Sequence, residues 1–187
     1  MTLSKSFPHR RTMRLPEFDY SQAGAYFVTI VAQDRKPYFG QVVDEEMVLN
    51  EVGKIVAEVW VEIPEHFLNV ELGEFVVMPN HIHGIIVITV EATHANIVAA
   101  RHAVPSQEDA IEKFGKPVPA SLPTIMRSFK SAATKKVHGS TNYKEGRIWQ
   151  RNYYEHVIRN ERDYQAICDY ILANPLNWEK DGEYSTT

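Results

Sequence analysis

The chain has 187 residues, of which 44% are hydrophobic and 24% charged, a composition typical of one folded domain with a buried core. Its longest apolar run, residues 84–90, is far shorter than the roughly 20 residues that span a bilayer, which argues against a transmembrane protein. A single cysteine, Cys168, excludes a disulfide framework and a cysteine-rich zinc site. Because the first residues lack the apolar segment of a secretion signal, we expect a cytoplasmic protein.

The formal net charge of −4 conceals a segregation of charge along the chain. Residues 1–16 carry four basic side chains and no acid, and residues 44–74 carry nine acids against one lysine. Residues 121–162 carry nine basic side chains against three acids. A fold that gathers the two basic segments on one side would present a phosphate-attracting face and an acidic back. The alternative is a set of solvated surface charges that never meet.

The first half of the chain predicts five strands and one helix. The strands are expected at residues 24–32, 40–43, 46–49, 70–78 and 81–90. Asp44-Glu45 predicts a hairpin between the second and third strands, and Pro79-Asn80 predicts a turn between the last two. Asn50 can cap a helix that runs from residue 51 to about residue 63, where Pro64 would stop it.

The second half begins with a change of composition. Residues 91–122 contain many alanines and three prolines, which predicts an extended insertion that could hold a short helix near residues 109–114. A basic helix is expected from about Leu122 to Val137, followed by a short strand at residues 147–149. The last helix should begin at Asn160, with Asp163 three residues later as in a capping box, and should end at Pro175.

The order of these elements predicts an α+β fold. We expect one antiparallel sheet with helices packed on one face, close to the ferredoxin-like (RRM-like) arrangement. One domain should cover residues 17–178, including the insertion at residues 91–122. A basic N-terminal arm, residues 1–16, would precede it, and a polar tail, residues 179–187, would follow it.

The sharpest chemical motif is Met78-Pro79-Asn80-His81-Ile82-His83. Residues i and i+2 of a strand face the same side, so the imidazoles of His81 and His83 should project together. Two such imidazoles supply half of a divalent metal site. The pair also fits two partly buried histidines that bond the backbone, so the spacing alone does not establish a metal site.

Tyr170 and Asn174 are four residues apart, so they should share one face of the last helix. An oxygen of Asn174 would complete a three-ligand site, and a phenol beside a Lewis-acidic cation can attack a phosphodiester. An ordinary phenol has a pKa near 10, so such a site must assist its deprotonation. Among the 9 tyrosines, Tyr164 and the pair Tyr153-Tyr154 are rival candidates. Tyr170 could also be a core aromatic of an amphipathic helix.

Four segments of the chain resemble the REP-associated tyrosine transposases, which are related to the single-tyrosine transposases of small bacterial insertion sequences. They are residues 20–29, 75–83, 148–161 and 170–175, and the resemblance extends from about residue 10 to residue 178. It implies a His-hydrophobic-His endonuclease and strand transferase that acts on single-stranded DNA beside hairpin-forming, REP-like palindromes. Such an enzyme uses Mg²⁺ or Mn²⁺ and leaves a 5′-phosphotyrosine and a free 3′-hydroxyl.

The resemblance also implies roles for individual residues. Tyr170 becomes the nucleophile, His81 and His83 become metal ligands, and Asn174 becomes the third ligand, although insertion-sequence relatives often carry Gln at that position. The resemblance further implies an oligomeric state. REP-associated members of the family look monomeric, so we expect a monomer, with a dimer as the alternative.

The resemblance also implies that the basic segments bind DNA. The candidates for contacts with the DNA backbone are Arg10, Arg11, Arg14, Arg127, Lys130, Lys135, Arg147, Arg151 and Arg159. Phe7, Trp149 and Tyr153 could stack on unpaired bases or pack inside the fold. For His156 we expect a structural hydrogen bond, and for Cys168 a buried filler.

Three other functions remain open at the level of sequence. The first is a domesticated protein that binds DNA hairpins on the same fold without cleaving them. The second is a replication initiator or relaxase, for whose usual extra region this chain has little room. The third is a small-molecule metalloenzyme built on the paired histidines, which would need an enclosed apolar pocket.

Overall fold

The computed structural model describes residues 18–89, 118–143 and 146–180. The predicted basic arm, most of the predicted insertion and nearly all of the polar tail therefore lie outside the described residues. The same holds for Phe7 and for Arg10, Arg11 and Arg14. None of the helices within the described ranges is both long and apolar enough to cross a bilayer.

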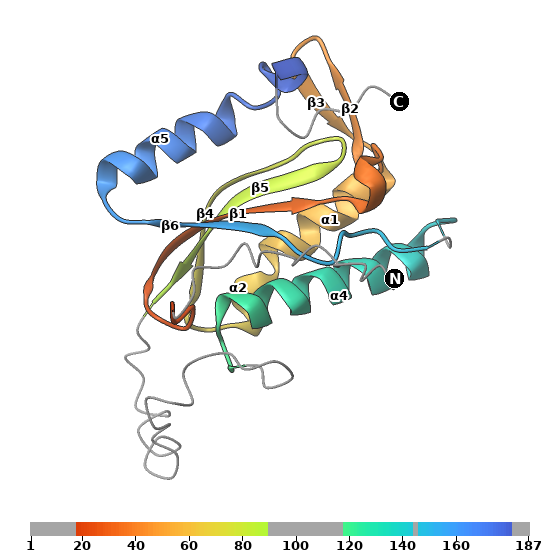
Figure 1. The fold of residues 1–187 in the computed structure, drawn as a ribbon. Coiled ribbons are helices and arrows are strands. Elements are labelled where there is room, and N and C mark those ends of the chain that lie inside the picture. Colours follow the sequence, from red (N-terminus) through yellow and green to blue (C-terminus); the bar gives the residue numbers. More distant parts are fainter. Residues whose placement is uncertain (1–17, 90–117, 144–145, 181–187) are drawn as a thin grey trace, which may run out of the picture.

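An antiparallel four-stranded sheet forms the centre of the fold (Figure 1). Its strands lie in the order β4 (Val70–Val77), β5 (His81–Ile88), β1 (Gly24–Val31) and β6 (Tyr154–Ile158). A separate hairpin consists of β2 (Gly40–Val43) and β3 (Glu46–Leu49), and it turns at Asp44-Glu45 as predicted. The predicted α+β class with an antiparallel sheet is thereby confirmed.

The two capped helices begin where the sequence predicts. Helix α1 (Glu51–Val61) follows Asn50, whose side chain accepts a hydrogen bond from the Gly53 N–H at 2.9 Å. Helix α5 (Glu161–Leu172) follows Asn160, whose side chain accepts from the Asp163 N–H at 2.9 Å. Helix α4 (Leu122–Ser140) runs three residues further than predicted. Two 3-10 turns, η1 (Gln33–Arg35) and η3 (Trp178–Lys180), complete the elements used below.

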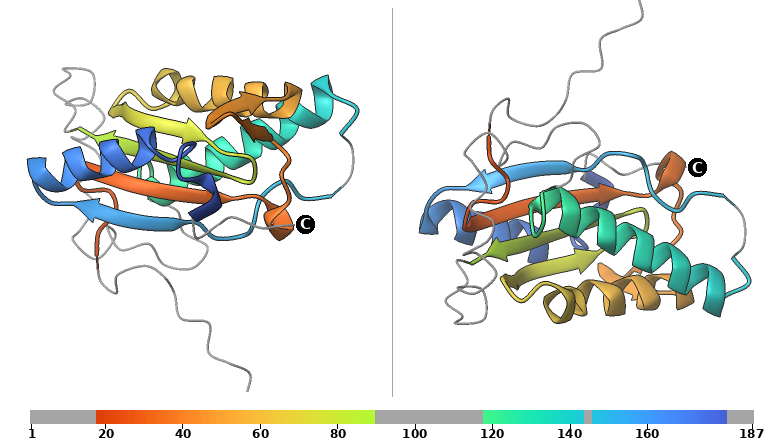
Figure 2. Two further views of the ribbon diagram at one scale, coloured as in Figure 1. Left: turned by 90° about the horizontal axis from the view of Figure 1, so that it is seen from above. Right: turned by 90° about the horizontal axis from the view of Figure 1, so that it is seen from below.

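The helices cover both faces of the sheet, and this corrects the prediction that they all pack on one face. Helices α1 and α4 lie on one face and α5 lies on the other (Figures 1 and 2). The reason is that β1 and β5 are apolar on both sides, so each face needs a cover. Ile82 and Ile86 pack into the cluster under α1 and α4, whereas Ile85 packs with Phe27 under α5.

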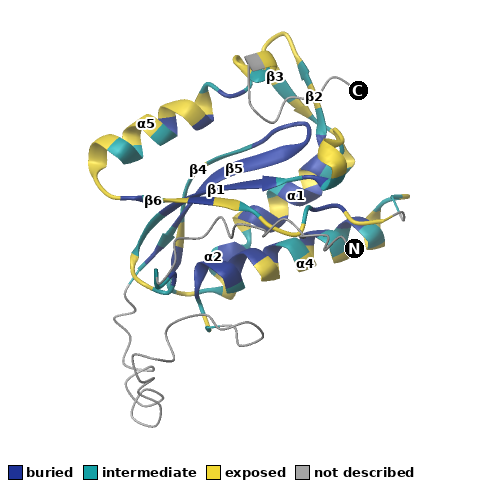
Figure 3. Ribbon diagram, viewed as in Figure 1, coloured by how far each residue is buried: buried dark blue, intermediate teal, exposed yellow. Residues whose placement is uncertain are grey.

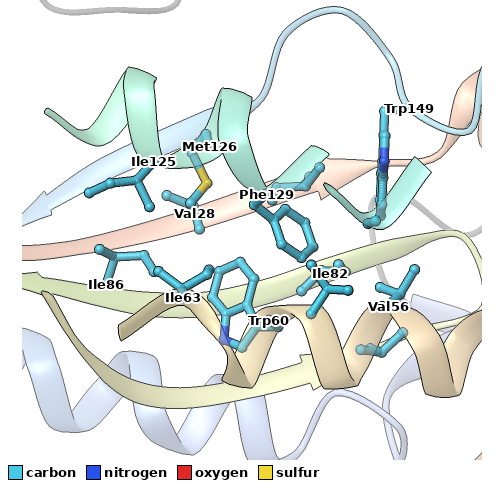
Figure 4. Close-up of a cluster of buried hydrophobic side chains, with 14 of the residues drawn as sticks. Val28, Val56, Trp60, Ile63, Ile82, Ile86, Ile125, Met126, Phe129 and Trp149 are labelled. Atoms are coloured by element: carbon cyan, nitrogen blue, oxygen red, sulfur yellow. The ribbon is translucent and has the colours of Figure 1, made fainter. Parts of the chain in front are cut away.

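The larger core lies between the sheet and helices α1 and α4 (Figures 3 and 4). Trp60 is fully buried there, with its ring 5.2 Å from the Phe129 ring and 6.0 Å from the Phe75 ring, centre to centre. Its indole lies against the backbone of Gly84, where any Cβ would overlap indole atom Cζ2. A glycine at this point of β5 therefore allows the aromatic core to contact the sheet directly.

Three local predictions need correction. Strand β6 was not predicted, and residues 147–149 form only an isolated bridge between Trp149 and Ala32 instead of a strand. Helix α1 ends at Val61, before Pro64, and Pro64 instead sits at the start of the short helix α2 (Ile63–His66). Proline suits that position because its missing N–H would have no partner in the first helical turn. Helix α5 ends at Leu172, three residues before Pro175.

Candidate active site

Strand β5 begins with the two histidines, and their side chains lie on the face that α5 covers. The His81 and His83 rings are 4.3 Å apart, centre to centre, and are 0% and 3% exposed. Helix α5 brings Tyr170 to the same place, with its hydroxyl 3.1 Å from His83 Nε2. The structure therefore assembles the three residues that the sequence analysis named first.

Aromatic rings surround the histidines. The Phe27 ring stacks on His83 at 5.3 Å and meets the Tyr170 ring edge-on at 6.1 Å. The Trp178 ring, from the turn after α5, lies 5.8 Å from the His81 ring. These contacts restrict how the imidazoles and the phenol can turn, so the site is held by packing as well as by hydrogen bonds.

Both histidines use Nδ1 for contacts within the fold. His83 Nδ1 lies 2.8 Å from Thr29 Oγ1, which faces it from the neighbouring strand. His81 Nδ1 lies 2.9 Å from Asn80 Oδ1. Metal-binding histidines usually engage one ring nitrogen with the protein in this way and coordinate through the other. Nε2 is therefore the nitrogen of each ring that can coordinate a metal.

The donor set fits a divalent cation that accepts nitrogen and oxygen. The described residues contain no group of three or more His, Cys, Asp or Glu side chains that could hold a metal, so two imidazoles need an amide, a phenol, water or a substrate oxygen beside them. Asn174, one turn beyond Tyr170, has a buried side chain that is 2% exposed. Imidazole nitrogen suits transition metals, so this set favours Mn²⁺ over Mg²⁺.

Tyr170 is not a core aromatic, which was the alternative left open by the sequence. It is 46% exposed, and the buried face of α5 is instead formed by Cys168 and Ile171. Cys168 is a buried filler, as predicted. Burial raises the pKa of the rival Tyr164, whose hydroxyl lies against Gly73. Tyr170 is therefore the candidate whose hydroxyl meets a histidine.

Lys130 has a role inside the fold. Its ammonium donates to the carbonyl oxygens of Gln150 at 3.0 Å and Asn152 at 2.8 Å, and it lies 5.6 Å from the centre of the Tyr153 ring. Burial lowers the pKa of Lys130 to about 8. The side chain thus holds the segment that leads into β6, a use that the sequence analysis did not anticipate.

The other described basic candidates are on the surface. Lys135 and Arg147 line an open hollow between α4 and residues 146–149, together with the hydroxyls of Ser131 and Thr134. The further exposed candidates are Arg127, Arg151 and Arg159. The acidic segment does not form a separate back, because α1 lies on the same face as α4, and Lys136 of α4 contacts Glu58 and Glu62 of α1 at 3.2 and 3.0 Å.

Several residues around the site were missed or given no role. Thr29, Phe27 and Trp178 contact the histidines, and only the pairing of β1 with β5 shows that Thr29 faces His83. Trp149 is buried against Phe39 and Phe129 instead of being available to stack on a base. His156 makes the expected structural hydrogen bond, to Asp163 at 3.0 Å.

Known proteins resemble this chain over most of its length. No protein-family model matches the chain. An uncharacterised Haemophilus influenzae protein is 38% identical over 176 residues, covering 94% of this chain and 93% of that protein. A second H. influenzae protein, whose name places it among the REP-associated tyrosine transposases, is 27% identical and covers 84% of this chain and 73% of its own length.

Two further matches carry the same family name. The REP-associated tyrosine transposase of Escherichia coli K12 is 46% identical over 44 residues, which is 21% of this chain and 27% of that protein. A solved structure of a REP-associated tyrosine transposase bound to a REP hairpin shares the fold, with a TM-score of 0.54 and 20% identity over 85% of this chain and 70% of that chain. The sequence relatives assign this chain to the REP-associated tyrosine transposase family, and the solved structure shows that the fold is shared.

Proposed function

We propose that the chain is a metal-dependent DNA transesterase that cleaves single-stranded DNA beside a hairpin, with Tyr170 as its nucleophile. The observation that carries this proposal is the 3.1 Å contact between the Tyr170 hydroxyl and His83 Nε2, beside the second imidazole of His81. A half-exposed phenol held against a buried histidine pair is accessible to a polymeric substrate. It also lies beside the two imidazoles whose Nε2 atoms would hold the cation.

The proposed reaction exchanges one phosphate ester for another. Tyr170 Oη attacks the phosphorus of the scissile phosphodiester, so an Oη–P bond forms while the bond from phosphorus to the 3′-oxygen breaks. The phenol gives up its proton, and the departing 3′-oxygen takes one up to become a free hydroxyl. The product is a 5′-phosphotyrosine, which the 3′-hydroxyl of another strand can attack in the reverse sense to complete strand transfer.

The residues of this chain would divide the work as follows. A divalent cation held through Nε2 of His81 and His83, with the Asn174 amide oxygen as third donor, would polarise the phosphodiester. Phe27 keeps the Tyr170 and His83 rings in their relative orientation. Since Tyr170 and His83 meet within one chain, this arrangement favours catalysis by a monomer.

We infer that DNA phosphates lie along the basic surface. The hollow presents the cations of Lys135 and Arg147 and the hydroxyl of Ser131, groups that can bind a phosphate. The proposed backbone contacts are Arg10, Arg11, Arg14, Arg127, Lys135, Arg147, Arg151 and Arg159. Lys130 would act indirectly by holding residues 150–152. The solved relative is described as bound to a REP hairpin, which supports a folded palindrome as the substrate class.

A denaturing gel tests the proposal. The full chain is mixed with Mn²⁺ and end-labelled single strands that carry palindromes from its own genomic neighbourhood. A labelled protein band that requires both Mn²⁺ and an intact Tyr170 is expected. Tyr170→Phe should abolish this band, whereas Tyr154→Phe, which changes an equally exposed tyrosine, should not. Hairpin binding without an adduct over many substrates would instead identify a binding protein that does not cleave.

A further inference from the structure

Asn80 links three parts of the fold at the turn between β4 and β5. Its side chain is 2% exposed, with Nδ2 donating to the carbonyl oxygen of Arg35 at 3.1 Å and Oδ1 lying 2.9 Å from His81 Nδ1. Its own backbone oxygen accepts from the Ala32 N–H at 2.7 Å. The carboxamide therefore sits in a fixed place, between the end of β1 and the first histidine.

The chemistry of these partners fixes the orientation of the amide. A carbonyl oxygen only accepts hydrogen bonds, so the amide atom that faces Arg35 must be the nitrogen. The oxygen of Asn80 then faces His81, and it too can only accept. His81 must consequently carry a hydrogen on Nδ1, and in the neutral ring the lone pair is on Nε2.

The backbone conformation of η1 sets the direction of the Arg35 carbonyl, which accepts from Asn80. Asp34 and Arg35 have φ values of 58° and 54°, a left-handed conformation that is uncommon for residues other than glycine. The turn is held by a hydrogen bond from the Arg35 N–H to the Ala32 oxygen at 3.1 Å. This uncommon conformation therefore directs the Arg35 carbonyl toward the Asn80 side chain, which in turn contacts His81.

His83 differs from His81 in this respect. Its two ring nitrogens meet the hydroxyls of Thr29 and Tyr170, and each hydroxyl can either donate or accept. These contacts are compatible with either neutral form of the His83 ring. Of the two histidines, His81 is the one whose Nδ1 partner, the Asn80 oxygen, is compatible with a single neutral form of the ring.

We propose that Asn80 is a positioning residue that locks His81 in the Nδ1–H form, so that Nε2 is its ligating nitrogen. The part of this inference that concerns a metal rests on the proposed function, whereas the form of the ring does not. Asn80 touches no reacting atom in this scheme. It acts through His81, as partners behind metal-binding histidines do.

The form of the ring can be measured on the metal-free full chain by long-range ¹H–¹⁵N correlation of the imidazoles. The wild-type His81 signals should show the hydrogen on Nδ1, and Asn80→Ala should move the population toward the Nε2–H form. Asn80→Asp keeps an oxygen that accepts from Nδ1 but loses the hydrogen that Asn80 donates to Arg35, so it should restore the wild-type pattern in part. Wild-type signals that show the hydrogen on Nε2 would overturn the inference without any variant.

Mn²⁺ titration by calorimetry provides the second measurement. Asn80→Ala should weaken Mn²⁺ binding by about 10- to 100-fold, the usual effect of losing a partner behind a ligand. The matched control is Asn50→Ala, because the Asn50 amide likewise donates to a backbone carbonyl, whereas its oxygen accepts from a backbone N–H instead of from a histidine. That control should change the affinity less than about twofold, since it leaves the ring partners in place.

The two measurements separate the inference from the proposed function. Equal Mn²⁺ affinities for Asn80→Ala and Asn50→Ala would overturn the positioning role. A wild-type chain that binds no Mn²⁺ would overturn the proposed metal chemistry, and the imidazole spectra would still decide whether Asn80 sets the form of His81.

Discussion

Replacing Tyr170 with phenylalanine should tighten metal binding while it abolishes cleavage. In this structure the Tyr170 hydroxyl lies 3.1 Å from His83 Nε2, which is the nitrogen that coordination would require. A cation can bind His83 only if this hydroxyl moves away from Nε2. Tyr170→Phe removes the competing contact and leaves the His81–Asn80 and His83–Thr29 contacts in place.

The size of the effect follows from the contact that is lost. A hydrogen bond within a protein contributes a net stabilisation of about 0.5–1.5 kcal/mol. Since about 1.4 kcal/mol corresponds to a tenfold change in affinity, Mn²⁺ should bind roughly 2- to 12-fold more tightly to the variant. Tyr170 is 46% exposed, so water can replace its partner, and we expect the lower half of this range.

Calorimetric Mn²⁺ titration of the wild type, Tyr170→Phe and Tyr154→Phe is the appropriate assay. Tyr154 is also 46% exposed, so its variant controls for removing a surface hydroxyl. Weaker binding by Tyr170→Phe would refute the reasoning, because the phenol would then be contributing to the metal site instead of competing with it. An unchanged affinity would show that the hydroxyl does not occupy His83 in solution.

Three other predictions concern the core, a buried lysine and the basic hollow. Gly84→Ala should lower the free energy of unfolding by about 1–3 kcal/mol in urea denaturation, because the added Cβ would overlap the buried indole of Trp60. Burial lowers the pKa of Lys130 from 10.5 to about 8. Between these pH values the unfolded chain binds more protons than the folded chain, so the free energy of unfolding should rise with pH. Lys130→Met should remove that rise, as measured by urea denaturation. Removing the two exposed cations that line the hollow, with Lys135→Ala and Arg147→Ala, should reduce the salt dependence of hairpin binding by about 1.4–1.8 in the slope of log K against log salt. An unchanged slope would exclude phosphate contacts by these two residues.

The elements that depend on local signals could be predicted from the sequence. Both asparagine caps, Asn50 and Asn160, lie where the sequence predicts them, because capping involves only residues within one helical turn. Strand β6 was missed for the opposite reason. It is an edge strand that pairs with β1, and its sequence, Tyr-Glu-His-Val-Ile, lacks the alternation of polar and apolar residues that predicts a strand.

The candidate site could be predicted only in part. The spacing of His81 and His83 sets their common face. Helical spacing with Asn174 made Tyr170 one candidate among several and the resemblance favoured it, and its hydroxyl lies 3.1 Å from His83 Nε2. Thr29 could not be identified, because its place opposite His83 depends on the register between strands distant in sequence. The hydrogen bond of Asn80 likewise depends on the direction of the Arg35 carbonyl, which no local sequence signal reveals.

Alternation along β5 separates the residues that stabilise the fold from those that form the site. Ile82 and Ile86 point into the large cluster under α1 and α4, whereas His81, His83 and Ile85 point toward α5. The cluster that holds α5 is small, and its buried members are Phe27, Ile85, Ile158, Cys168 and Ile171. Because little apolar surface fixes this helix, the position of Tyr170 should be more sensitive to substitutions in the small cluster than global stability is. The strand thereby provides a base for the histidines in the sheet, while the proposed nucleophile is carried by a helix that the smaller cluster holds.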